Sequence, residues 1–529
     1  MSAEWGQLDR LVERAEALAG AWGARARAST TNGQERAILR LFGVHGLDGA
    51  GRPLASTTVD RWLAGDSRRL ASGIALPFAM ALLEFDLEPQ ELAMDVASGN
   101  VDLALEAELL REPDRRAVAE VEAGRLAAAA IQRIDAQRTV RHETLDILGD
   151  APRPWLGATL REREVDAALG EAAVLIAAGL DLIRIEVPIG RELAARLTDA
   201  GRDVPEWRPR DSADRERPMP VPTGSQRALA ILRDAVDEAA AERRAYVRLA
   251  IVVPALGAPE GAVVAAFERI DVIASDAMTE IVADGVEPER ALADHAFAHR
   301  LARRAGTTIL VGSGPLVVAP DLSAGIPSDP ATRAGRALAL QLLGVSLART
   351  DGLGDSQIIV AALPPWLTEE PTPGALAMAE VAVRRALFPG HPFAFLEPPA
   401  GGGRPGLWPY VQAAAAVRAG DIALVLRARS FGSGDAASAT EAARASAAVA
   451  ADVAAAGTSP GPLTGPALAH ARGMVATAVA TLDGLADRGW RTVAGDHPDN
   501  ARGRPLGGDA VTDRTESFDP LAAILGPRG

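Results

Sequence analysis

Hydrophobic residues recur at helical spacing through the first part of the chain. Leu8, Leu11 and Ala15 lie three and four positions apart, and the same kind of spacing runs through residues 117–134. This periodicity predicts helices with one apolar face. No stretch of this region shows the alternation expected of a strand. Residues 1–150 are therefore predicted to form a helical N-terminal cap.

From Pro154 onward, short runs rich in β-branched residues alternate with longer Ala-, Leu- and Arg-rich stretches. This alternation predicts βαβ units and a parallel sheet. The predicted strands are 155–159, 182–187, 246–253, 270–274, 307–312, 357–361, 393–396 and 421–426. The predicted helices lie near 163–178, 224–243, 260–267, 286–304, 331–348, 373–387, 408–418 and 436–455. Eight alternations over roughly 300 residues favour a closed (β/α)8 TIM barrel over an open doubly wound sheet.

The pattern divides the chain into three parts: the cap at 1–150, the barrel at 151–456, and a C-terminal helix and tail at 457–529. The C-terminal helix is predicted to end near Arg488, and the apolar end of the tail to pack back on the body. A proline-rich, charged segment, 203–222, follows the second barrel strand. Its composition suits either a lid or a surface loop.

Composition narrows the choice of partners and location. Of 529 residues, 48% are hydrophobic but only 4% are aromatic, so the core is expected to consist of Ala, Leu, Val and Ile. The formal net charge is −15 and no basic tract offsets it, so a nucleic acid partner is not expected. The N-terminus lacks the apolar core of a signal peptide, and no later run reaches membrane-spanning length. We therefore expect a cytoplasmic protein without a membrane partner.

Two residue types are absent, and each absence excludes a chemistry. All 55 basic residues are arginine, so this chain cannot itself form a Schiff base with a carbonyl cofactor through lysine. There is no cysteine, which excludes disulfides, thiolate nucleophiles and Cys-ligated metals.

Catalytic groups of a barrel lie at the carboxyl ends of its strands and in the loops that follow. The turn Gly312-Ser313-Gly314-Pro315 is either a small anion-binding nest of backbone N–H groups or an ordinary strand exit. His295 and His299 are four residues apart and share one face of a helix. They suit a metal site only with a third ligand, and otherwise they are surface or packing histidines.

Glu268, Arg269, Asp271 and Asp276 surround the fourth predicted barrel strand. A carboxylate–arginine network at a barrel rim can hold a substrate. The same residues can equally form a structural set of ion pairs. Both interpretations remain open from the sequence.

A longer pattern of residues recurs in order along the chain. It starts with the stretch TTNGQERAILRLFGVHGLDGAGRPL, residues 30–54, and continues with Val59-Asp60. It includes Tyr246, Arg248-Leu249, Pro259-Glu260, Glu268 to Val272, Asp276-Ala277, Phe388-Pro389, Pro398-Pro399, Gly507-Gly508 and Asp519-Pro520-Leu521. This ordered set resembles the alpha (large) subunit of lysine 5,6-aminomutase, which is related to D-ornithine 4,5-aminomutase. The resemblance spans essentially the whole chain.

The resemblance implies a barrel capped by helices, with residues 30–54 in the cap. It also implies a separate beta subunit that carries the adenosylcobalamin-binding domain and the lysine that holds pyridoxal phosphate. The implied activity is that of an isomerase, which catalyses a radical 1,2-amino shift on a small amino acid. The barrel would exclude water and cradle the cofactors.

In the resembling family, side chains of the alpha subunit contact pyridoxal phosphate at five positions. These positions fall on Val187, Glu192, Pro254, Thr279 and Gly314, and the expected Arg, Ser, Tyr and Asp identities are all changed. We therefore expect the pyridoxal phosphate contacts to be altered or lost, with adenosylcobalamin bound mainly through the partner.

Two alternatives to an aminomutase-like subunit remain open from the sequence. One is a non-catalytic or repurposed barrel relative that binds a cobalamin-binding partner. The other is an independent barrel enzyme that uses Glu268, Arg269, Asp271 and Asp276.

Overall fold

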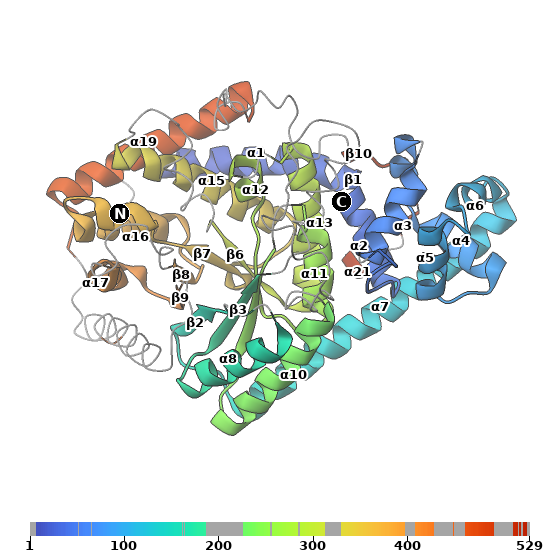
Figure 1. Cartoon of the computed structure of the whole chain (residues 1–529). Coiled ribbons are helices and arrows are strands. Elements are labelled where there is room, and N and C mark those ends of the chain that lie inside the picture. The colour runs from blue at the N-terminus through green and yellow to red at the C-terminus, as the bar shows by residue number, and fades with distance from the viewer. Residues whose placement is uncertain are drawn as a thin grey trace, which may run out of the picture.

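Eight parallel strands close into a barrel in chain order (Figure 1). The computed structural model describes residues 7–50, 52–64, 66–160, 162, 164–186, 226–253, 256–283, 286–312, 329–396, 408–427, 448, 461–490, 511–516, 518–519 and 522–525. The barrel strands are β2 (Trp155–Thr159), β3 (Leu182–Glu186), β4 (Arg248–Val252), β5 (Val272–Ala274), β6 (Thr308–Val311), β7 (Ile358–Ala361), β8 (Phe393–Leu396) and β9 (Ile422–Arg427). Pairing of β9 with β2 closes the ring. The predicted TIM barrel and its eight strands are confirmed.

Helices follow the strands and form the outer layer of the barrel. They are α8 (Val165–Ala177), α10 (Gln226–Arg243), α11 (Ala258–Phe267), α12 (Ala277–Ala283), α13 (Pro288–Ala305), α15 (Pro330–Thr350), α16 (Pro373–Leu387) and α17 (Trp408–Ala419). All but the short α12 were predicted from the spacing of apolar residues. The segment 203–222 and the predicted helix 436–455 lie outside the described residues, apart from Ala448.

The N-terminal region is mostly helical, with one exception. Its helices are α1 (Leu8–Ala28), α2 (Asn32–Leu41), α3 (Leu54–Leu63), α4 (Ala75–Phe85), α5 (Pro89–Ser98), α6 (Leu103–Leu109) and α7 (Pro113–Leu148). A short strand, β1 (Ser29–Thr31), pairs antiparallel with β10 (Val511–Asp513). The prediction that this region contains no strand was wrong, because three residues are too few to show an alternating pattern.

The C-terminal residues return to the body of the protein. Helix α19 (Gly465–Arg488), which was predicted to end near Arg488, packs against α1, α15 and α16. The short helix α21 (Ala522–Leu525) lies against α7 and α13. Ile524 and Leu525 are buried there, which confirms that the apolar end of the tail packs on the body.

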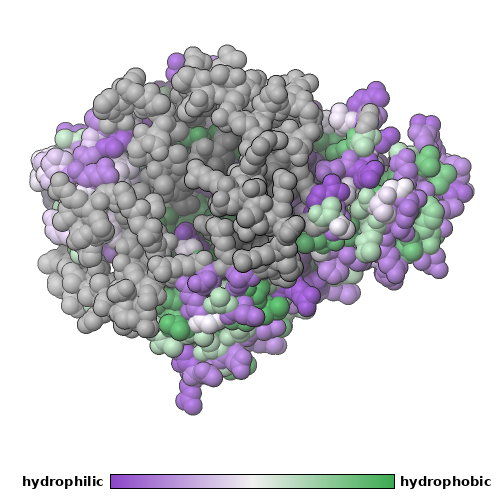
Figure 2. Space-filling model, in the orientation of Figure 1, coloured by the Kyte–Doolittle hydropathy of each residue, from purple (hydrophilic) through white to green (hydrophobic). Residues whose placement is uncertain are grey.

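The surface of the cap mixes polar and apolar side chains. Figure 2 shows the visible cap helices as mostly hydrophilic, with separate apolar spots between the charged groups. Phe85, Met94 and Leu105 are among the exposed apolar residues of the cap. In the described part of the chain, none of the helices combines the length and the apolarity that crossing a bilayer requires.

Helix α2 joins the cap to the barrel through buried charges. All ten of its residues are buried, and it packs against α11 of the barrel layer. The carboxylate of Glu260 on α11 accepts hydrogen bonds from Arg36 at 3.1 Å and from Arg40 at 2.8 Å. Burial alone would raise the pKa of Glu260, but Arg40 and Arg36 outweigh it and lower the pKa. The carboxylate is therefore charged at neutral pH.

A second buried cluster lies beside the first. Thr31, at the N-cap of α2, donates its hydroxyl hydrogen to Asp294 on α13 and accepts a hydrogen bond from the backbone N–H of Gln34 at 3.0 Å. Asp294 also pairs with Arg290 one turn earlier on α13. The start of α2 is thus fixed to α13 while its middle is fixed to α11.

We predict that Glu260→Gln lowers the free energy of unfolding by about 3 to 5 kcal/mol, because two buried guanidinium groups lose their counter-charge. Chemical denaturation at neutral pH measures this loss. Glu289→Gln is the matched control, because Glu289 forms a surface pair with Arg25 in which the side chains are 48% and 63% exposed. Its cost should not exceed about 1 kcal/mol. Equal costs for the two variants would contradict a stabilising role for the buried cluster.

Candidate functional site

The interior of the barrel is apolar in the middle and polar toward both ends. Strand register places Leu182, Leu310 and Leu426 on the inner face, in one buried cluster with Ala250 and Val272. Gly157 makes room for this packing, because a Cβ there would lie 2.9 Å from Leu182 and Leu426 side-chain carbons. The leucines therefore form an apolar floor inside the barrel, below its carboxyl-terminal end.

Above this floor, an arginine side chain faces the interior. Arg184 pairs in register with Thr159 on β2 and with Ala250 on β4, so all three side chains point inward. The Nε–H of Arg184 donates to the Thr159 hydroxyl at 2.7 Å. Thr159 is the last residue of β2, so the pair lies toward the carboxyl-terminal mouth. Sequence analysis missed Arg184, although a charge between Ile183 and Ile185 in an apolar strand was a usable signal.

Asp276 connects two strand exits at the same end of the barrel. Its carboxylate accepts hydrogen bonds from the backbone N–H groups of Met278 at 2.8 Å and Gly312 at 2.7 Å. Burial raises the pKa of Asp276, while these backbone bonds act in the opposite direction. Because the Gly312 N–H bonds to Asp276, it is not directed at an external anion. Ser313, Gly314 and Pro315 lie outside the described residues.

His295 and His299 are both buried on the inner side of α13, so they are packing histidines and not surface ones. The Nδ1 of His295 lies 2.9 Å from the Ala291 carbonyl oxygen, which can only accept. Nδ1 therefore carries the hydrogen, and Nε2 accepts from the Ser275 hydroxyl at 3.0 Å. His299 Nδ1 lies 2.9 Å from the carboxylate of Asp351.

These groups surround a cavity of about 10 Å³ between α1, α13, α15 and the end of β5. Its lining includes Ser275, Asp276, His295, His299 and Asp351. That volume suits about one water molecule. Within the described residues, no set of three His, Asp or Glu side chains could hold a metal ion. The arrangement favours the packing interpretation of the two histidines.

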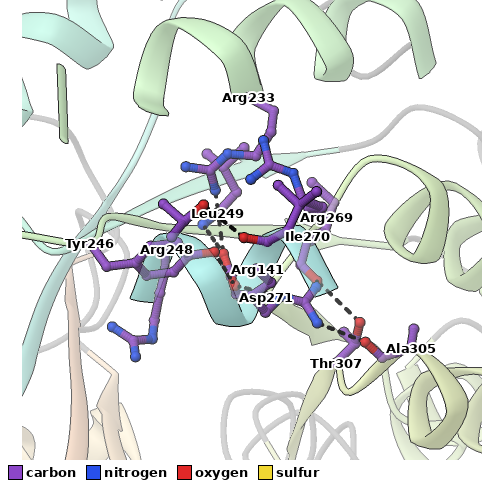
Figure 3. A network of polar contacts seen from close by, with 12 residues as sticks. Arg141, Arg233, Tyr246, Arg248, Leu249, Arg269, Ile270, Asp271, Ala305 and Thr307 are labelled. Carbon is purple, nitrogen blue, oxygen red and sulfur yellow. Dashed lines mark hydrogen bonds and ion pairs between the residues drawn. The ribbon is translucent and has the colours of Figure 1, made fainter. Parts of the chain in front are cut away.

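The other predicted rim residues, Glu268, Arg269 and Asp271, lie at the amino-terminal end of the barrel. Asp271 precedes β5, and four groups converge on its carboxylate (Figure 3). Its contacts are Tyr246 OH at 2.8 Å, Leu249 N–H at 2.9 Å, and the guanidinium groups of Arg141 at 3.1 Å and Arg233 at 3.4 Å. Arg141 comes from α7 and Arg233 from α10, so Asp271 links both helices to the sheet.

Arg269 and Glu268, which precede Asp271 by two and three residues, belong to the same group of structural contacts. Arg269 pairs with Asp237 on α10. Glu268 accepts hydrogen bonds from Arg133 and Gln226, each at 2.8 Å. Only Asp276 among the four candidates lies at the carboxyl-terminal end. The four residues therefore do not converge on one rim site, and Glu268, Arg269 and Asp271 form a set of structural ion pairs.

Of the five positions implied as pyridoxal phosphate contacts, the structure describes one. Thr279 lies on α12, and its Oγ1 is buried with no hydrogen-bond partner among the described residues. It has no ring that could stack on a pyridine. Val187, Glu192, Pro254 and Gly314 lie outside the described residues.

The closed ring of eight parallel strands with helices outside it defines a (β/α)8-barrel protein. Proteins of this class carry their active sites at the carboxyl-terminal mouth of the barrel. Residues 2–401 match the family model described as the D-lysine 5,6-aminomutase TIM-barrel domain of the alpha subunit. The chain belongs to this family, which is one of isomerases.

Two curated relatives agree with this assignment. The lysine 5,6-aminomutase alpha subunit of Fusobacterium nucleatum is 24% identical over 404 residues, 75% of this chain and 72% of the relative. That of Acetoanaerobium sticklandii is 24% identical over 393 residues, 73% of this chain and 70% of the relative. Among solved structures, Burkholderia cenocepacia dihydropteroate synthase matches 56% of this chain and 93% of its own, with a TM-score of 0.31 and 16% identity.

We predict that Asp271→Asn lowers the free energy of unfolding by about 3 to 5 kcal/mol, because it leaves Arg141 and Arg233 without their shared buried carboxylate. Urea denaturation measures the change. Asp135→Asn is the control, because Asp135 pairs with Arg304 at the surface, where the side chains are 41% and 31% exposed. That substitution should cost no more than about 1 kcal/mol. An Asp271 variant as stable as the parent would exclude the structural role.

A further prediction concerns how the stability of the protein depends on pH. Burial first, and then the neighbouring His299, lower the pKa of His295 to about 3. The unfolded chain binds this proton near pH 6.5, whereas the folded chain does not until about pH 3, so protons favour unfolding between these values. As the pH falls from 6.5 toward 3, this group should therefore lower the free energy of unfolding by up to about 1.4 kcal/mol per pH unit.

The test compares His295→Gln with the parent protein from pH 6.5 to 4.5. The variant should show a shallower dependence of the unfolding free energy on pH, because the histidine contribution is removed. His142 is exposed, so His142→Gln should follow the parent curve. Parallel curves for all three proteins would show that His295 is protonated in the folded state.

Proposed function

We propose that this chain is the alpha, barrel-forming subunit of an adenosylcobalamin-dependent isomerase that resembles lysine 5,6-aminomutase. In this proposal it acts with a separate beta subunit that carries the cobalamin-binding domain. The observation that carries the proposal is the family match over residues 2–401, together with the closed barrel and the buried link between cap and barrel. The two curated relatives are themselves named alpha subunits, which supports a second subunit.

The residues of this chain would form one wall of a closed reaction chamber. In this proposal the leucine floor would keep water from entering through the barrel, and Asp276 holds the exits of β5 and β6 together through its bonds to Met278 and Gly312. A dry, pre-formed site protects reactive intermediates from side reactions. When bound to the beta subunit, adenosylcobalamin would supply the radical chemistry at this mouth.

Pyridoxal phosphate does not fit this chain in the manner of the family. The side chains of Val187, Glu192, Pro254 and Gly314 supply no cation, and Glu192 would repel a phosphate. Thr279 cannot stack on the pyridine ring. We therefore propose that the handling of the amine cofactor is altered or lost.

We predict that the chain forms a stable complex with a beta subunit of the same organism, and that this complex retains adenosylcobalamin. Size-exclusion chromatography with detection of the corrin absorbance tests both points. Addition of amino acid substrates should then give a radical signal in low-temperature electron paramagnetic resonance. The isolated chain is the control, and it should retain no cobalamin.

The possible outcomes separate the alternatives. A complex that retains cobalamin but gives no radical signal with any amino acid would favour a non-catalytic relative. Turnover by the isolated chain would favour an independent barrel enzyme. Absence of a complex would contradict the proposal. An absorbance band of a pyridoxal imine in the complex would contradict the altered cofactor contacts.

A further inference from the structure

We infer that the outer end of the cap is a docking surface for a partner protein that presents a basic, amphipathic helix. The surface is formed by the end of α4, by α6 and by the start of α7, which lie far from the barrel (Figure 1). We call it the acidic cap face, and it includes Leu83, Glu84, Phe85, Leu105, Glu106 and Val118. The inference goes beyond the proposed isomerase role, and its test requires no turnover.

The first argument is the charge of this part of the chain. Residues 83–114 contain ten acidic residues and one basic residue, so their formal charge of −9 is more than half of the −15 of the whole chain. Arg115 contacts both Glu84 at 3.3 Å and Glu112 at 3.2 Å. One guanidinium group is thus shared between two carboxylates, and negative charge remains in excess. Such a surface attracts a partner of positive charge.

The second argument is a buried carboxylate within this surface. Glu106 on α6 is only 6% exposed, and its Oε2 is buried with no hydrogen-bond partner among the described residues. Burial, and after it the neighbouring Glu84, raise the pKa of Glu106, whereas Arg115 acts in the opposite direction. Buried polar atoms without a partner are rare in folded proteins. A cation that docks beside Glu106 would supply the counter-charge that the cap itself does not provide in full.

The third argument is the distribution of exposed apolar side chains. Half of the large apolar residues that are exposed in the described part of the chain lie between positions 83 and 121. Leu105 is 65% exposed and adjoins Glu106, and Val118 is exposed on α7. Helix α4 packs against both α6 and α7, so the exposed residues of the three helices share one end of the cap. Figure 2 shows apolar side chains between hydrophilic ones on the cap. A concentration of exposed apolar side chains is typical of an interaction site.

The mixture of acidic and apolar groups determines the chemistry of the occupant. A helix with an apolar stripe flanked by lysine or arginine matches both kinds of group at once. A second copy of this chain does not suit the same surface, because a two-fold contact would bring the acidic residues 83–114 against themselves. Nucleic acids and anionic membranes are repelled for the same reason.

Fluorescence anisotropy tests the surface with the full-length chain and a labelled helical peptide of leucine and lysine, about 18 residues long. Leucines at helical spacing give this peptide one apolar face, and a peptide of the same composition in scrambled order is the negative probe. We expect saturable binding of the amphipathic peptide and at least about fivefold weaker binding of the scrambled one. Binding should weaken as salt is raised, because exposed charges are screened.

Variants of the acidic cap face locate the binding. Glu84→Gln combined with Glu106→Gln should weaken binding of the amphipathic peptide by about tenfold, because two carboxylates that attract its lysines are removed. Leu105→Ser should weaken binding by several-fold, because an exposed apolar contact is lost.

Matched controls lie on α10, in the helical layer of the barrel. Asp234→Asn combined with Glu238→Gln removes the same number of charges from exposed positions, and Ile231→Ser removes an exposed apolar side chain. Both controls should bind the amphipathic peptide as the parent does.

Chemical denaturation of Glu106→Gln gives a second measurement. This variant should be at least as stable as the parent, because the buried Oε2 has no hydrogen-bond partner to lose among the described residues. A residue that serves only the fold would lose stability on substitution, so a marked destabilisation would contradict the docking role of Glu106.

The outcomes separate the docking surface from its alternatives. Weaker binding by the variants of the acidic cap face, with the α10 controls unchanged, supports the inference. Equal weakening by the α10 controls would show a response to overall charge only, and would overturn it. So would equal binding of the two peptides, or no saturable binding. A dimer in sedimentation equilibrium that is lost in Leu105→Ser would assign the surface to a second copy instead.

Discussion

The buried carboxylate of Glu260 is the contact on which the arrangement of cap and barrel depends. It has no exposed surface, and its two arginine partners come from α2, whose residues are all buried. A charge in this position is tolerated only while both guanidinium groups stay in place. The cap is therefore restricted to one position against α11, and the adjacent pairing of Thr31 with Asp294 restricts it against α13 as well.

The two ends of the barrel hold different polar contacts. Below the leucine floor, Asp271 ties α7 and α10 to the sheet, and Arg248 is held by Asp150 and Trp155. Above the floor, Arg184 and Asp276 lie at the mouth. The contacts named at the lower end share no residue with those named at the mouth. Membership in the aminomutase family thus goes with a closed barrel that side chains far from the mouth hold together.

The eight barrel strands were predictable from the sequence because each is a short apolar run between helical stretches. The polar clusters were not, because their members are distant in sequence and no local pattern connects Asp271 to Arg141 or Glu260 to Arg36. The opposite reason applies to Glu268, Arg269, Asp271 and Asp276, which are near one another in the chain but lie at the two ends of β5. Arg184 was overlooked for another reason: a single charge in a strand has meaning only once the register shows that it faces inward.

The pairing of β1 with β10 also has a consequence for biosynthesis. Ser29–Thr31 emerge from the ribosome early, but their partner strand, Val511–Asp513, is translated only after the whole barrel. Until then, the backbone edge beside α2 has no partner from this sheet. Domains commonly begin to fold during translation. In this protein the cap can begin to fold before the barrel is translated, but β1 gains its partner strand only after residues 511–513 have been made.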